Sequence, residues 1–147
     1  MKTHETHPGI LGSAGIILDN CSYNPHTRAG WPLPNPEVKE VDLVGHAWFM
    51  ERSVIPYLWR EKPPTWDNGE DIQLSYSAQR YGNIKTYCPP HPPDDKSWWG
   101  SIKGNALGID EVASSCPTVK SHGQFFGERD MCVRHALDNG WRTVNNV

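Results

Sequence analysis

The stretch WDNGEDIQLSYSAQRYGNIKTYCPPH, residues 66–91, is the part of the chain around which the remainder is organised. Its pattern predicts a helix over 70–81, because Glu70 and Asp71 directly follow a run of turn and cap residues. Gly82 comes next, and its lack of a Cβ suits the left-handed conformation in which helices commonly end. We therefore expect two carboxylates in the first turn of a central helix.

The faces of this helix follow from residue spacing. Apolar residues four and seven positions apart form a buried face, and polar residues between them face water. The two sets are Leu74, Ala78 and Tyr81, and Gln73, Ser77 and Arg80. A short strand is predicted over 84–87, and the prolines after it stop the strand because proline cannot donate to a sheet. His91 lies just beyond, where a loop would bring it back over the acids.

Two acids at the start of a helix have an ordinary structural explanation, because the unpaired N–H groups and the macrodipole there favour negative charge. Three further features point to chemistry instead. They are Trp66 upstream, Gly69 directly before the acids and His91 one strand later. Together they make this stretch a candidate active site.

The whole block resembles the second half of the catalytic domain of GT-A glycosyltransferases, especially the family-2-like enzymes and their galactosyl- and N-acetylgalactosaminyl-transferase relatives. The matching elements are Gly69-Glu70-Asp71, Tyr81-Gly82 and Pro90-His91. The upstream segment 41–52 also resembles the strand and glycine turn that lead into an arginine-bearing helix in these enzymes. The resemblance covers roughly residues 10–140 and is specific between about 41 and 100.

The resemblance implies a role for each matching residue. Asp71 is the expected general base, which removes the proton of an acceptor hydroxyl, and Glu70 is expected to hold a neighbouring hydroxyl. Trp66 and Gly69 are expected to bind substrate, and His91 to ligate Mn²⁺ or Mg²⁺. A helix start favours the ionised acid, which suits a base. The expected reaction transfers a sugar from a nucleotide-sugar donor to a carbohydrate acceptor with inversion.

The chain departs from this family at the donor site. GT-A enzymes hold the metal and the diphosphate with an Asp-x-Asp motif, which this sequence lacks. The nearest approximations, Glu40-Val41-Asp42 and Glu128-Arg129-Asp130, fall within a predicted strand and a predicted helix. No glycine-rich phosphate loop occurs either. We therefore expect an α/β fold, a partial GT-A mixed sheet with flanking helices and no donor-binding half, with little or no transfer activity by itself.

A second candidate segment lies upstream. Residues 38–44 alternate apolar and charged side chains, which predicts a half-buried strand, and Gly45 and His46 interrupt the pattern before it resumes. In GT-A enzymes the equivalent glycine turn lies beside the donor sugar. The resemblance therefore makes Gly45 and His46 candidate substrate-binding residues, with a hydrogen-bonded structural histidine as the alternative for His46.

An aromatic pair, Trp98 and Trp99, follows His91 in a polar loop. An indole can stack on the apolar C–H face of a sugar, so both are candidate substrate-binding residues. The alternative is that one of them fills the core and the other covers it. Asp94 or Asp95 would complete a weak metal site with His91, although a histidine in a proline-rich turn is more often structural.

Length and composition bound the remaining expectations. The chain has 147 residues and is predicted to form one domain over 1–147, with 1–9 as a flexible lead. A formal net charge of −3 provides no basic surface for nucleic acid, and no apolar run is long enough to span a bilayer. Four widely spaced cysteines without a signal peptide favour reduced thiols and a cytoplasmic location. An oligomer in which a second copy completes the fold is compatible with these features.

Other elements follow from local patterns. Residues 10–18 predict a buried strand whose small residues let another backbone approach closely. Residues 19–36 predict a long loop. Ser53 is expected to cap a short helix that reaches Trp59, and residues 128–139 predict a second helix.

Two other interpretations of the acids stay open. One is a carbohydrate-binding module that keeps the acceptor cleft and has lost catalysis. The other is a hydrolase that uses Glu70 or Asp71 with another acid such as Glu61. A hydrolase would require the two acids to face each other across a pocket at roughly 5–9.5 Å.

Overall fold

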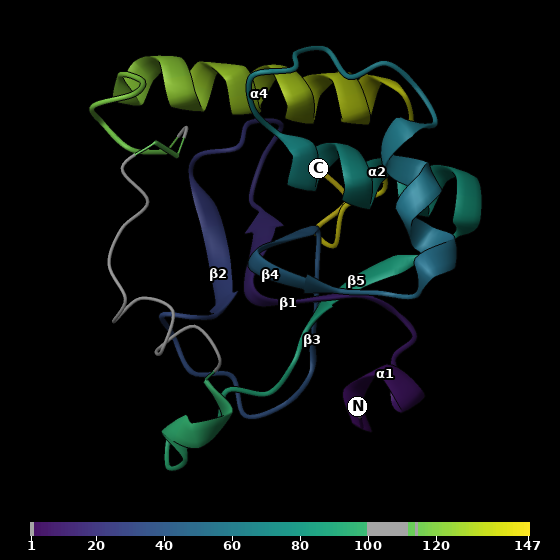
Figure 1. Cartoon of the computed structure of the whole chain (residues 1–147), viewed down its shortest axis with the longest axis vertical. Helices are drawn as coiled ribbons and strands as arrows, with labels where there is room; N and C mark the ends of the chain where they lie inside the picture. Colours follow the sequence, from purple (N-terminus) through teal and green to yellow (C-terminus); the bar gives the residue numbers. More distant parts are fainter. Residues whose placement is uncertain (1, 100–111, 114) are drawn as a thin grey trace.

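The computed structural model of the chain describes residues 2–99, 112–113 and 115–147. These residues form a curled mixed sheet of five strands with flanking helices, so the predicted α/β class is confirmed (Figure 1). The strands are β1 (Gly9–Leu18), β2 (His26–Gly30), β3 (Lys39–Val41), β4 (Leu43–Phe49) and β5 (Lys85–Cys88). The helices are α1 (Lys2–Thr6), α2 (Glu70–Gly82) and α4 (His122–Asp138), with 3-10 turns η1 (Arg52–Trp59) and η2 (Lys96–Trp98).

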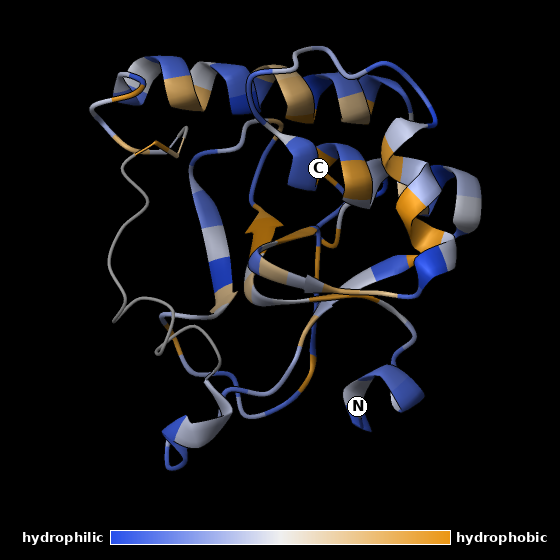
Figure 2. Cartoon of the chain, viewed as in Figure 1, coloured by the Kyte–Doolittle hydropathy of each residue, from blue (hydrophilic) through white to orange (hydrophobic). Residues whose placement is uncertain are grey.

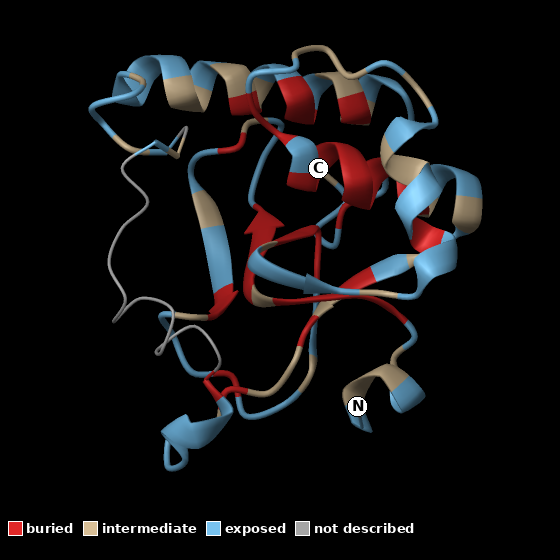
Figure 3. Cartoon of the chain, viewed as in Figure 1, coloured by how far each residue is buried: buried red, intermediate tan, exposed pale blue. Residues whose placement is uncertain are grey.

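Strand β1 is the centre of the sheet. It pairs with β4 along one edge, and with β5 and then β2 along the other. Ala14 therefore pairs with Gly45 of β4 on one side and with Gly30 of β2 on the other. Only the pairing with β5 is parallel, and β3 extends the sheet beyond β5. The end of β1 is hydrophobic and buried (Figures 2 and 3), so the strand predicted over 10–18 is confirmed.

A β-bulge in β4 replaces the predicted break at Gly45 and His46. Gly12 pairs with Trp48 and Ala14 with Gly45, so β4 carries one residue more than β1 between these pairs. His46 takes a positive φ of 68° within the bulge. The prediction of a break here was wrong, because β4 continues through the bulge and the interruption falls instead at Asp42, between β3 and β4.

The close approach that permits this bulge is the one expected from the small residues of β1. A Cβ added to Gly12 would lie 2.4 Å from the Val44 Cβ and 2.9 Å from the Ala47 carbonyl oxygen. Any side chain at Gly12 would therefore push β4 away from β1.

Helix α2 lies between the sheet, η1 and α4, and every residue from 71 to 78 is buried. The predicted exposure of Gln73 and Ser77 was wrong, because η1 and the residues after it cover that face. The Ser77 hydroxyl donates to the Tyr57 carbonyl oxygen at 2.6 Å, and the Gln73 amide donates to the Glu61 carbonyl oxygen at 3.4 Å. Polar side chains at these positions satisfy backbone groups that burial would otherwise leave unpaired.

The end of α2 also differs from the prediction. Asn83, rather than Gly82, takes the left-handed conformation, with φ 52°. Gly82 stays in the helix, where a Cβ would lie 2.8 Å from the Tyr57 ring. The glycine therefore makes room for η1, and asparagine ends the helix because its short side chain tolerates this conformation.

Helix α4 contains residues 128–138 of the helix predicted over 128–139, and it begins earlier. Ser121 caps it, because its hydroxyl accepts a hydrogen bond from the Gln124 N–H at 3.2 Å. This places Arg129 in the middle of the helix instead of its first turn. Gly140 follows the helix with φ 88°.

Two upstream predictions were partly right. The segment 19–36 contains β2, which the turn-rich composition did not predict. The helix ending at Trp59 is present as η1, but Ser53 does not cap it. The Ser53 hydroxyl instead donates to the Glu51 carboxylate at 3.3 Å.

The segment expected as a flexible lead, 1–9, contains α1 at the end of the molecule opposite α4 (Figure 1). His4 of α1 lies edge-on to Phe49 with ring centroids 5.4 Å apart. Its Nε2 is 3.3 Å from the Glu51 carboxylate.

Two of the cysteines, Cys88 and Cys132, are buried with free thiols, whereas Cys21 is exposed. Burial raises the pKa of the Cys88 thiol to about 12 and that of Cys132 to about 11. Within the described part of the chain, no helix combines the length and apolar character that crossing a bilayer requires.

Candidate functional site

A cavity lies between the β4 bulge and the start of α2, and we name it the acceptor pocket after the role that the sequence predicts for its acids. It has a volume of about 370 Å³. Its lining residues are Gly45, His46, Ala47, Trp48, Glu70 and Asp71. Four of these, Gly45, His46, Glu70 and Asp71, are residues that the sequence singled out from two separate segments. The fold brings both segments to one cavity.

Gly69 places the two acids at this pocket. It is the N-cap of α2, with φ 86°, and an added Cβ would lie 2.5 Å from the Cys132 sulfur of α4. The Gly69 N–H donates to the Asn68 side chain at 2.8 Å. Only glycine combines this conformation with this close approach, so the glycine before the acids fixes where α2 begins.

Asp71 forms a buried ion pair that the sequence did not predict. Arg129 of α4 donates from Nη2 to the Asp71 Oδ2 at 2.6 Å, and from Nη1 to the Asn68 Oδ1 at 3.1 Å. The two charged side chains are only 6% and 10% exposed, so solvent screens the pair weakly. The guanidinium carbon also lies 4.1 Å from the centroid of the Tyr23 ring.

The ion pair favours the charged form of Arg129. Burial acts to lower the pKa of Arg129, yet the Asp71 charge and hydrogen bond raise that pKa above its ordinary value. The second Asp71 oxygen, Oδ1, accepts from the Ile72 N–H at 2.9 Å. Each carboxylate oxygen has two lone pairs, so Asp71 keeps acceptor capacity toward the pocket.

The sequence does contain a pattern that indicates the mid-helix position of Arg129. Ser121 and Gln124 have the spacing of a capping box, which would start α4 six residues earlier than predicted. Arg129 would then fall in mid-helix, where a buried arginine needs an acidic partner.

His46 lies in the bulge at the edge of the acceptor pocket. The residue is exposed, yet partial desolvation by its neighbours lowers its pKa, and the charge of Arg28 lowers it further. The neutral imidazole is therefore favoured, which leaves one ring nitrogen as a donor and the other as an acceptor for a hydroxyl.

The depressed pKa of His46 predicts a pH dependence of stability. The unfolded chain, where the ordinary value of 6.5 applies, binds the proton more readily than the folded chain. The contribution of His46 is thus complete above pH 6.5 and is lost as the pH falls. We expect the free energy of unfolding of the wild type, relative to His46→Asn, to decrease between pH 7.5 and 5, as measured by urea unfolding. Asparagine suits this control because it tolerates a positive φ. A difference that stays constant with pH would contradict the prediction.

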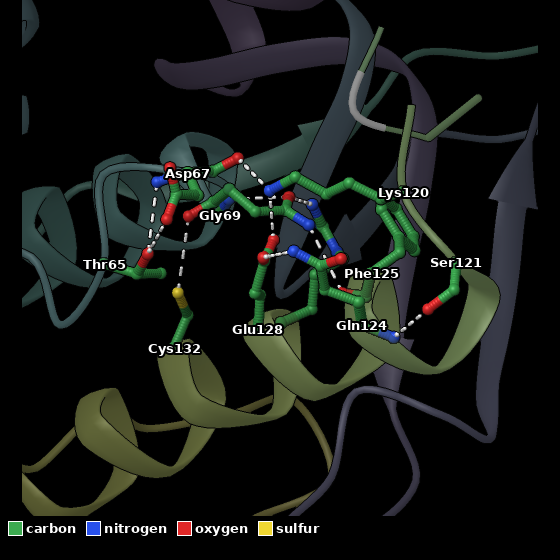
Figure 4. A network of polar contacts seen from close by, with 11 residues as sticks. Thr65, Asp67, Gly69, Lys120, Ser121, Gln124, Phe125, Glu128 and Cys132 are labelled. Atoms are coloured by element: carbon green, nitrogen blue, oxygen red, sulfur yellow. Dashed lines mark hydrogen bonds and ion pairs between the residues drawn. The ribbon is translucent and has the colours of Figure 1, made fainter. Parts of the chain in front are cut away.

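The loop before α2 is tied to α4 by polar contacts (Figure 4). Lys120 donates to the Asp67 carbonyl oxygen at 2.9 Å and to the Glu128 carboxylate at 2.5 Å. The hydrogen bond from Lys120 lowers the pKa of Glu128. Within the loop, the Asp67 N–H donates to the Thr65 hydroxyl at 3.1 Å. These contacts hold the chain from Thr65 to Gly69 against α4.

A second cavity, which we call the tryptophan pocket, opens beside this loop. Its volume is about 190 Å³, and Trp66, Gly69 and Glu70 line it. Trp59 of η1 also lines it, a residue that was not singled out from the sequence. Glu70 therefore borders both pockets.

His91 lies on the other side of β1 from the acids. Its ring lies near Gly30, which pairs with Ala14 along one edge of β1. The acids lie near Gly45, which pairs with Ala14 along the opposite edge of β1. The His91 Nδ1 is 2.8 Å from the Pro89 carbonyl oxygen, and the side chain is fully buried. The expected position of His91 over the acids was therefore wrong, because β1 lies between them.

The aromatic pair at 98–99 divides as the structural alternative expects. Trp99 is buried, packs edge-on against His91 and donates from its indole N–H to the Pro92 carbonyl oxygen at 2.9 Å. Trp98 is 60% exposed. Neither is among the residues that line the acceptor pocket or the tryptophan pocket.

The hydrogen bonding of His91 favours the tautomer that metal-ligating histidines use, but the described residues place no further metal ligands beside it. Donation from Nδ1 to the Pro89 carbonyl oxygen leaves Nε2 as a buried nitrogen without a partner among the described residues. The Asp95 carboxylate accepts from the Ser97 N–H and hydroxyl instead. In the described ranges no group of three or more His, Cys, Asp or Glu side chains is placed to hold a metal. The described residues therefore do not make up a Mn²⁺ or Mg²⁺ site, and metal ligation by His91 stays a prediction.

Glu61 does not face the acids as a hydrolase would require. Its carboxylate accepts from the Tyr81 hydroxyl at 3.2 Å and lies 3.6 Å from Arg80. These partners belong to the last turns of α2, about 15 Å along the helix axis from Glu70. The hydrolase interpretation is not supported.

Comparison of the chain with protein-family models, with curated proteins and with solved structures found no match.

Proposed function

We propose that the acceptor pocket is the acceptor site of a GT-A-type glycosyltransferase, which transfers a sugar from a nucleoside-diphosphate donor to a hydroxyl with inversion. One observation carries the proposal. Gly45, His46, Glu70 and Asp71, which the motif resemblance assigns to substrate binding and catalysis, line one cavity although they come from separate elements.

Asp71 is the proposed general base. The ion pair with Arg129 fixes the carboxylate in place, and its remaining lone pairs can accept a hydrogen bond from a hydroxyl. An acceptor hydroxyl in the pocket would donate to Asp71, and its proton would pass to the carboxylate as the oxygen attacks the anomeric carbon. The nucleoside diphosphate would leave from the opposite face, which inverts that carbon.

The other pocket residues position the acceptor. Glu70 is exposed at the start of α2 and can accept a hydrogen bond from a neighbouring hydroxyl. The neutral His46 can donate to or accept from a further hydroxyl. The proposal covers the acceptor side, because the described residues assign no group to the diphosphate. The free thiols of Cys21, Cys88 and Cys132 support a cytoplasmic location.

A second candidate function is a carbohydrate-binding module without catalysis. The observation that favours it is the same ion pair, because Arg129 already donates to one Asp71 oxygen at 2.6 Å and the Asp71 side chain is only 10% exposed. In a module, the pocket would bind sugar without dependence on nucleotide.

Sugar transfer in an Asp71→Asn variant tests the proposal. The protein, expressed from its complete reading frame, would be assayed with labelled nucleotide-sugars and oligosaccharide acceptors. We expect kcat to fall by about 10²–10⁴-fold, the usual contribution of a general base. Glu70→Gln should mainly raise KM for the acceptor.

Asp138→Asn is the matched control, because Asp138 is an exposed acid at the far end of α4. Circular dichroism must show that Asp71→Asn stays folded, since it leaves Arg129 without a countercharge. Wild-type transfer by a folded Asp71→Asn protein would overturn the assignment. Acceptor binding without transfer, unchanged by nucleotide, would favour the module.

A further inference from the structure

Two neighbouring tryptophans are among the most exposed large hydrophobic side chains described. Trp59 is 67% exposed and Trp66 is 68% exposed. Their rings are stacked, with centroids 6.4 Å apart and planes inclined by 23°. Burying an indole surface away from water is favourable, so a ligand that covers both rings would bind with the free energy of that burial.

The tryptophan pocket combines this apolar surface with hydroxyl-binding groups. Asp67, Glu70 and Thr65 lie among its lining residues, and the first two carry carboxylates. A pyranose ring has the matching chemistry, because its C–H face is apolar while its edge carries hydroxyls. The volume of about 190 Å³ is below the roughly 300–1,000 Å³ typical of drug-sized ligands, so the pocket suits a single ring.

We infer that the tryptophan pocket binds a second sugar ring of the acceptor, so that the acceptor is a neutral oligosaccharide of at least two units. This inference rests on the proposed function. Glu70 borders both cavities, so one ring in the tryptophan pocket can be linked to another whose hydroxyl reaches Asp71.

The spacing of the indoles determines how the ring binds. A sugar ring sandwiched between two indole planes would require those planes to lie about 7 Å apart, twice the ~3.5 Å contact distance between carbon atoms. The centroid separation of 6.4 Å is shorter than this, so the ring lies across the exposed faces of the pair.

The charge of the pocket selects a neutral ligand. Asp67 and Glu70 are both exposed on its rim and accept hydrogen bonds from hydroxyls, but they repel carboxylate and phosphate groups. Sugars that carry such groups should therefore bind more weakly than their neutral counterparts.

The loop that carries Trp66 is held in place before a ligand arrives. Figure 4 shows Thr65, Asp67 and Gly69 facing α4, with Lys120 bonded to the Asp67 carbonyl oxygen. A fixed loop loses little conformational freedom on binding, which favours affinity.

Titration calorimetry with neutral sugars tests the inference on the folded chain. The probes would be maltotriose, cellotriose and chitotriose, with glucose and N-acetylglucosamine as their single units. We expect a trisaccharide to bind more tightly than its single unit, and Trp59→Ala or Trp66→Ala to weaken its binding about tenfold, or about 1.4 kcal/mol. Trp59→Phe should retain much of the affinity because an aromatic face persists. Trp98→Ala is the matched control, an equally exposed tryptophan outside both pockets.

The outcomes separate this inference from the proposed function. Loss of trisaccharide binding in both alanine variants, with Trp98→Ala unchanged, supports the second subsite even if Asp71→Asn leaves transfer intact. Wild-type trisaccharide affinity in both alanine variants overturns the subsite even if Asp71→Asn abolishes transfer. Equal loss in Trp98→Ala, or no binding of any neutral trisaccharide, also overturns it.

Discussion

Replacing Arg129 with methionine is expected to lower the free energy of unfolding by about 3–5 kcal/mol, the usual cost of removing one partner of a buried ion pair. The variant leaves the Asp71 carboxylate nearly enclosed without its countercharge, and Asn68 loses a second donor. It also removes the guanidinium that lies 4.1 Å from the Tyr23 ring centroid. Urea unfolding at neutral pH, followed by circular dichroism, measures the loss.

Arg134→Met is the matched control, because Arg134 is an exposed arginine of the same helix. It should change stability by less than about 0.5 kcal/mol. In the double variant Asp71→Asn/Arg129→Met, much of the loss should be recovered because neither charge is then buried. Equal stability of Arg129→Met and Arg134→Met would show that the ion pair does not contribute as inferred.

Replacing Asp42 with alanine is expected to cost about 2–4 kcal/mol, because it leaves one buried and one partly exposed N–H group without an acceptor. Asp42 is buried between β3 and β4 and accepts from the Leu18 N–H and the Val144 N–H, each at 2.7 Å. Burial raises the pKa of Asp42, while these two hydrogen bonds act in the opposite direction. The carboxylate thus joins the end of β1 to the C-terminal segment.

Asp42→Asn separates the two hydrogen bonds, since an asparagine keeps one acceptor and presents an amide to the other donor. Its thermal stability should lie between that of the wild type and Asp42→Ala. Asp94→Ala, at an exposed acid, serves as the control. A wild-type melting temperature for Asp42→Ala would mean that water replaces the carboxylate at both donors.

The parts of the fold that were predictable depend on local chemistry. Helix α2 could be predicted from its two acids, the cap at Gly69 and the apolar spacing. Strand β1 could be predicted from the continuous apolar run of 10–18. The juxtaposition of Gly45 and His46 with the acids came from the motif resemblance rather than from spacing. The structure places these two residues and the two acids around one cavity, and the functional proposal is based on that arrangement.

The parts that were missed depend on contacts between distant segments. The bulge at His46 exists because Gly12, on another strand, lets β4 approach closely. Gln73 and Ser77 are buried because η1 packs over them, which the helix period cannot indicate. The short strand β2 is held by its pairing with β1 and has no strong pattern of its own.

Burial of α2 from 71 to 78 also limits how this protein can diversify. These eight residues have no free surface on which new side chains can be tried without disturbing the interior. Under the proposed function, changes in recognition must therefore arise at the two segments that border the first turn of α2, which are the bulge and the loop that carries Trp66. The helix would be inherited nearly unchanged while its neighbours vary.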